Sequence, residues 1–64
     1  MFWFEEFDIT SLEKTGRREG YLAPDRKTAI QMCLYTKRLA DGKAQLGPTG
    51  VVIRTQGKAW ICCG

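Results

Sequence analysis

Residues 24–42, with the sequence PDRKTAIQMCLYTKRLADG, decide the fold. At 100° per residue, most apolar side chains of this stretch fall on one broad stripe of a helix, with Leu34 at the margin of the polar side. This pattern predicts an amphipathic helix that lies on a sheet. The stripe holds Ala29, Ile30, Met32, Cys33, Leu39 and Ala40, and the polar side holds Lys27, Gln31, Tyr35 and Arg38.

Both ends of this helix carry boundary signals. Either Pro24 occupies the first helical position or Asp25 caps the first turn, and both arrangements start the helix at the same place. At the other end, Asp41 is followed by Gly42, and glycine suits the left-handed residue that ends a helix. The helix is therefore expected within residues 24–41.

The residues before the helix predict a hairpin. Phe2–Thr10 is rich in aromatic and apolar residues, as a strand is, and 11–17 is a turn in which Gly16 takes a positive φ. Residues 18–23 form the second strand. If the first strand alternates regularly, Trp3, Phe7 and Ile9 share one face with Glu5; a bulge at Glu5-Glu6 would instead bring Phe4 and Phe7 to the same side. The sequence leaves both open.

The residues after the helix predict a loop and a second hairpin. The loop covers 43–50, and the strands 51–55 and 58–63 flank a two-residue turn at Gln56-Gly57. That turn pairs Ile53 with Trp60 and Val52 with Ile61. The chain is then one α+β domain over residues 1–64, a four-stranded antiparallel ββαββ sheet with the helix on one face. The other face, with apolar groups from both hairpins, meets solvent or a partner.

The composition argues against most catalytic chemistry. The chain has 64 residues and no histidine, so it lacks the commonest general base and the commonest metal ligand. Glu5 and Glu6 diverge on a strand and form no carboxylate pair. The glycines at 42, 47 and 50 match no phosphate-binding loop. We expect a protein that is not an enzyme and holds no cofactor and no metal.

The three cysteines are expected to be structural thiols in a reducing compartment. A disulfide from Cys33 to the C-terminus and a reactive thiol at Cys62 or Cys63 are the alternatives. The N-terminus is not that of a secretory signal, and no stretch is long and apolar enough for a membrane span. A soluble protein of the cytoplasm, monomeric or homodimeric, is expected.

The net charge of +3 is unevenly distributed. Residues 1–13 carry −4, and residues 14–64 carry +7. A row of bases on a helix can follow a phosphate backbone or an acidic protein groove, and it can equally be an ordinary solvated face. The candidate partner-binding residues are Arg17 and Arg18 of the first hairpin, and Arg26, Lys27, Tyr35, Lys37 and Arg38 of the helix.

The last stretch, VVIRTQGKAWICCG (51–64), resembles the end of small phage anti-CRISPR proteins of the type I-F class. The order of elements agrees over the whole chain, including Arg18-Glu19-Gly20 before the second strand. The resemblance implies an inhibitor that binds the backbone subunit of a CRISPR–Cas surveillance complex and blocks access of target DNA. It also implies non-specific binding of duplex DNA in some members. It assigns the contact first to Arg26, Lys27, Lys37 and Arg38, and second to Arg17 and Arg18.

A second resemblance concerns the middle of the chain. Thr15-Gly16-Arg17-Arg18, followed by Asp25-Arg26 and Ala29-Ile30, is similar to the arm-site DNA-binding domain of tyrosine integrases. That family combines a small antiparallel sheet with one helix and inserts strands into the major groove. It implies a small basic DNA-binding module as the alternative function, although the acidic first strand is unfavourable for entry into a groove.

Overall fold

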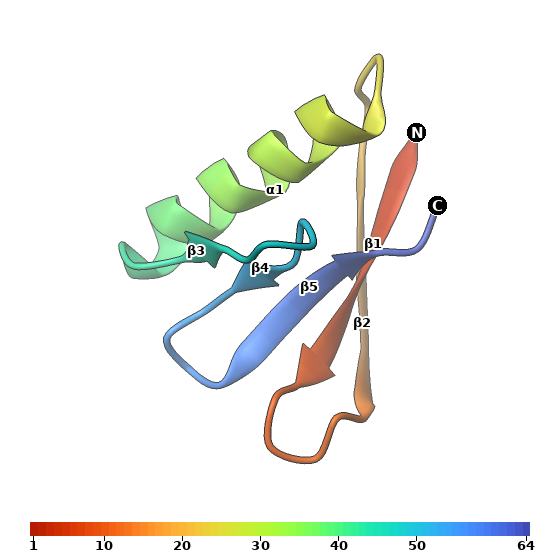
Figure 1. Ribbon diagram of the computed structural model, residues 1–64. Coiled ribbons are helices and arrows are strands. Elements are labelled where there is room, and N and C mark those ends of the chain that lie inside the picture. Colours follow the sequence, from red (N-terminus) through yellow and green to blue (C-terminus); the bar gives the residue numbers. More distant parts are fainter.

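A computed structural model of the chain describes every residue from Met1 to Gly64. The elements are β1 (Phe2–Asp8), β2 (Lys14–Tyr21), α1 (Arg26–Asp41), β3 (Gln45–Leu46), β4 (Val52–Ile53) and β5 (Lys58–Cys62). The strands form one antiparallel sheet in the order β2-β1-β5-β4-β3, and α1 lies across one face of it (Figure 1). The α+β class is confirmed. Helix α1, with its 16 residues, is too short to span a membrane.

The sheet has five strands rather than the predicted four. The additional strand, β3, lies within the segment 43–50 that was expected to be a loop. The amide of Gly47 donates to the carbonyl of Val51 at 2.7 Å, and Gly50 has a φ of 87°. This tight turn folds Gln45 and Leu46 back onto Ile53 and Val52. The prediction recognised the turn residues but not the two-residue pairing that they produce.

The last hairpin has a different register from the predicted one. Val52 pairs with Trp60 and Ile53 with Ala59, so the predicted pairing of Ile53 with Trp60 is wrong. The cause is a three-residue connection, 55–57, in which Gly57 has a φ of 76°. Such a loop places glycine in the left-handed region and avoids a positive φ at Gln56. Because the register moves by one residue, Val52 is fully buried while Ile53 lies on the open face, 38% exposed.

In the first hairpin, β1 alternates regularly and the irregularity lies in β2. All five pairs from Phe4–Cys62 to Asp8–Lys58 are in one register. Between the pairs Glu5–Arg18 and Phe7–Lys14, however, residues 15–17 of β2 face a single residue of β1. Gly16 allows this bulge with a φ of 93°. The turn is therefore 9–13 rather than 11–17, and Asp8 Oδ1 accepts from the amides of residues 10 and 11.

Helix α1 has the predicted ends, but its buried face is turned from the predicted one. Asp25 is the N-cap and accepts from the amide of Thr28, and Gly42 ends the helix with a φ of 74°. Ala29, Ile30 and Cys33 are buried as predicted. Leu34 and Lys37 are buried as well, whereas Met32, Leu39 and Ala40 are exposed. The buried positions 30, 33, 34 and 37 follow the helical repeat, so Lys37 belongs to the buried face. The prediction placed Lys37 among the exposed bases because it is a lysine.

The core lies between α1 and the helix-facing side of the sheet. The largest side chains in it are Phe4 and Trp60, joined by Val52 and Cys33. On the other side of the sheet, regular alternation of β1 places Trp3, Glu5 and Phe7. No helix covers this open face (Figure 1).

Candidate functional site

Ion pairs neutralise two of the four acidic side chains of the N-terminal segment. Lys14 pairs with Glu5 at 3.2 Å and Lys58 with Asp8 at 3.4 Å. Glu6 is buried and accepts from the hydroxyl of Thr15 at 2.6 Å. Two further pairs, Lys37–Glu19 and Arg54–Asp41, join α1 to the sheet and to the segment after β4. Of the acidic side chains of residues 1–13, Glu13 alone is exposed with neither an ion pair nor a side-chain hydrogen bond.

The remaining bases form no ion pair and are exposed. Most of them lie on α1 or directly after it, so the unpaired positive charge gathers along the helix. These bases are Arg17 and Arg18 on β2, Arg26, Lys27 and Arg38 on α1, and Lys43 beyond its end.

The structure brings together three of the predicted site residues on the outer side of α1. Lys27, Tyr35 and Arg38 are exposed and fall on one helical face. At 1.5 Å per residue, Lys27 and Arg38 are about 16 Å apart along the axis. Tyr35 is 64% exposed although it is aromatic. Arg38 is also oriented, because its Nε donates to the carbonyl of Ala44 at 2.9 Å.

The other predicted residues lie elsewhere. Lys37 points inward: its side chain is 6% exposed, bonded to Glu19, and its Nζ is 4.1 Å from the centre of the Trp60 ring. Arg18 lies over the ring of Trp3, 5.1 Å from its centre, on the open face of the sheet. The seven candidate residues therefore do not form one surface.

The first turn of α1 has a charge that does not favour the helix. Arg26 and Lys27 occupy this turn, and no acidic residue does. The N-terminal end of a helix carries partial positive charge, so cations there are unfavourable by a few tenths of a kcal/mol each. Asp25 alone offsets this, since it caps the helix; its hydrogen bonds from Thr28 lower its pKa. Helix stability therefore does not explain these two bases.

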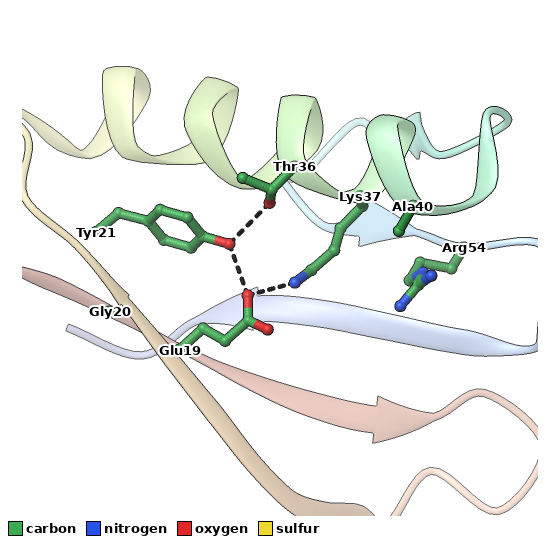
Figure 2. A pocket seen from close by; sticks show the side chains of 7 residues that line it. All are labelled: Glu19, Gly20, Tyr21, Thr36, Lys37, Ala40 and Arg54. Atoms are coloured by element: carbon green, nitrogen blue, oxygen red, sulfur yellow. Dashed lines mark hydrogen bonds and ion pairs between the residues drawn. The ribbon is translucent and has the colours of Figure 1, made fainter.

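Beneath the inner side of α1 lies an open groove of about 510 Å³ (Figure 2). Tyr21, Glu19 and Gly20 of β2 form one wall. The other residues that line it are Thr36, Lys37 and Ala40 of α1, and Arg54 after β4.

The polar groups of the groove form one network. The Tyr21 hydroxyl donates to Glu19 Oε1 at 2.7 Å and lies 2.9 Å from Thr36 Oγ1, and Lys37 Nζ donates to the same Glu19 oxygen. Partial burial alone would raise the pKa of Glu19, but the hydrogen bonds from Lys37 and Tyr21 outweigh it and hold that pKa below its usual value. Burial, with the hydrogen bond to Glu19, raises the pKa of Tyr21 well above its ordinary value. Neither group is tuned for proton transfer near neutral pH.

The cysteines are all free thiols in different environments. Cys33 is buried, Cys62 partly buried and Cys63 exposed. Burial raises the pKa of Cys33 to about 11, which keeps it protonated and unreactive at neutral pH. The described residues contain no cluster of three or more His, Cys, Asp or Glu side chains suited to a metal ion.

The groove was not predicted from the sequence. The sequence does indicate that Lys37 is buried, because it shares the helical repeat of Ile30 and Leu34. Nothing in the sequence indicates that Glu19 and Arg54 line the groove, since tertiary contacts alone bring them there. No family model, curated protein or solved structure matches the chain.

Proposed function

We propose that this chain is a non-catalytic binding protein, a phage-type inhibitor that binds a bacterial CRISPR–Cas surveillance complex in the host cytoplasm and blocks access of its nucleic-acid target. The contact is made by the outer side of α1. The observation that carries the proposal is the distribution of unpaired bases. Lys27 and Arg38, with Tyr35 between them, present positive charge on a helix, while two of the four acidic side chains of residues 1–13 are held in ion pairs.

The contact surface is narrower than the sequence implied. It comprises Lys27, Tyr35 and Arg38. Arg26 lies at one end of the helix with its guanidinium turned toward Gly50, away from these three. Lys37 is not part of this surface, because its ammonium group is buried against Glu19 and Trp60. The cost of cations in the first turn supports a binding role for Lys27, since a functional site often retains residues that do not stabilise the fold.

The alternative function is a small basic DNA-binding module. The observation in its favour is the same spacing of bases along α1, which suits phosphates as well as carboxylates. The two functions differ in their dependence on salt. Each phosphate contact makes log K fall by about 0.9 per unit of log salt concentration, so binding of duplex DNA through several bases weakens steeply.

Affinity capture distinguishes these functions. Tagged protein is incubated with a bacterial lysate that contains type I CRISPR effectors, with and without nuclease, and captured proteins are identified by mass spectrometry. Recovery of effector subunits that resists nuclease supports the inhibitor. Recovery that disappears with nuclease supports the DNA-binding module and contradicts the inhibitor. Recovery of one different protein keeps a protein-binding function and discards this target.

A further inference from the structure

Strand β2 is a free edge of the sheet. It has eight residues, and its only neighbour is β1. The opposite edge, β3, has only two residues. A long edge strand presents unpaired N–H and C=O groups that can pair with another strand.

The register identifies which groups are free. The carbonyl of Trp3 accepts from the amide of Cys63, and the amide of Asp8 donates to the carbonyl of Glu13. Odd residues of β1 therefore turn their backbone groups toward β5, and even residues turn theirs toward β2. Residues of β2 opposite the odd positions are Arg18 and Gly20, and their N–H and C=O groups point away from the sheet.

We propose that β2 binds an extended acidic segment of a partner protein as an added strand. The free groups of Arg18 and Gly20, two residues apart, match the hydrogen-bonding repeat of such a strand. Lys14, Arg17 and Arg18 lie along the edge without an acidic neighbour in residues 14–18. Lys14 is paired with Glu5, but both arginines are unpaired and available to carboxylates of the segment.

The groove supplies the second part of the site. Side chains of an added strand alternate between faces. A side chain opposite Glu19 lies on the helix side, beside Glu19 and Tyr21 at the β2 end of the groove. Because the Glu19 carboxylate is its neighbour, this position suits a neutral side chain.

The opposite face of the added strand meets a different surface. Side chains opposite Arg18 and Gly20 lie on the open face. At Gly20 there is no side chain, and the Trp3 ring lies over the backbone: an added Cβ would stand 3.1 Å from it. The segment thus carries a carboxylate beside Arg18 and an apolar group against Trp3.

Charge disfavours two of the registers in which a second copy could pair with β2. If the β2 strands of two copies pair antiparallel about Arg18, the Arg18 residues of the two copies lie opposite each other. If they pair about Glu19, the two Glu19 residues lie opposite each other. Like charges directly opposite one another destabilise a strand pair. An acidic segment has no such conflict.

The test uses the full chain, labelled with ¹⁵N, and two probe peptides, one with the repeat Glu-Thr-Val-Thr (the Glu–Val peptide) and one with the repeat Lys-Thr-Val-Thr (the Lys–Val peptide). In each repeat, a charged and an apolar side chain follow one another on the same face of the strand. With the Glu–Val peptide at millimolar concentration, we expect shifts and slowed amide hydrogen exchange at Arg18 and Gly20. Arg18→Glu should weaken binding about tenfold or more, a change in binding free energy of about 1.4 kcal/mol. Lys43→Glu, an equal charge change at an exposed, unpaired base beyond the end of α1, should have little effect.

Arg18→Pro removes the outward N–H and should weaken binding more than Arg18→Gln, which removes only the charge; unchanged β1 shifts confirm an intact fold. Three results overturn the proposal: no protection at Arg18 and Gly20 with millimolar peptide, equal binding of the Lys–Val peptide, or a dimer in sedimentation that Arg18→Pro dissociates. None of these results concerns the outer side of α1, so the proposed function is tested separately.

Discussion

The register of the last hairpin determines which of two neighbouring residues supports the fold. Val52 is fully buried opposite Trp60, and Ile53 is 38% exposed on the open face. The same substitution, to threonine, is therefore expected to have very different effects. Threonine nearly matches valine in shape, so Val52→Thr leaves almost no cavity and mainly introduces a buried hydroxyl.

The core around Val52 and Phe4 is apolar, and its one buried side-chain nitrogen or oxygen without a partner is the Nε1 of Trp60. We expect the hydroxyl to stay unsatisfied if it does not reach this nitrogen. An unsatisfied buried polar group costs about 2 kcal/mol. For a domain of this size, each kcal/mol lowers Tm by about 4–8 °C, so Val52→Thr should lower it by about 8–16 °C. Ile53→Thr keeps its hydroxyl in water and should cost less than about 1 kcal/mol.

Thermal unfolding followed by circular dichroism measures both values, with urea unfolding as a second readout. A larger loss in Ile53→Thr than in Val52→Thr would refute the observed register. It would favour the pairing of Ile53 with Trp60 that a two-residue turn produces.

Three further predictions concern buried and titrating groups. Lys37→Met should change the free energy of unfolding by no more than about 1 kcal/mol: the unbranched apolar chain can replace the lysine over Trp60, and the Glu19 side chain, 42% exposed, regains water. Lys37→Glu should cost at least about 3 kcal/mol, measured by urea unfolding. Equal effects of the two substitutions would contradict the inward position of Lys37. Because the folded-state pKa of Glu19 is lowered, its stabilisation is present above the unfolded value of about 4.3 and is lost as pH falls through the folded one; Tm between pH 6 and 2 should therefore fall less steeply in Glu19→Gln than in the parent. Iodoacetamide at pH 8 should modify Cys63 first and Cys33 only on unfolding, as peptide mass mapping would show; early labelling of Cys33 would contradict its burial.

The sequence predicted the features that depend on local chemistry. Asp25 and Gly42 end α1 as expected, because capping depends on residues within one turn of the helix. The sequence allowed either regular alternation along β1 or a bulge at Glu5-Glu6. The unbroken pairing of β1 with β5 shows regular alternation. The extra strand β3 was missed because its pairing extends over only two residues.

The candidate site was harder to predict because it depends on tertiary contacts. Lys37 was assigned to the binding surface as a base on a helix, but the helical repeat places it inward, against Trp60. Its partner Glu19 is 18 residues away in the sequence. Residue type predicts solvent exposure for most lysines, and it fails where a carboxylate and an aromatic ring together stabilise the buried ammonium group.

The central claim, that the outer side of α1 carries the binding function, is tested most directly by two matched double variants. Lys27→Gln with Arg38→Gln removes two bases from the helix. Lys14→Gln with Lys58→Gln removes two bases from strands β2 and β5, so the net charge changes equally. Capture of the partner is measured for both at several salt concentrations, after Tm confirms that each is folded. Capture that is lost only in the helix variant is the predicted result; equal loss in both variants, or capture by the helix variant at the parent level, would contradict the claim.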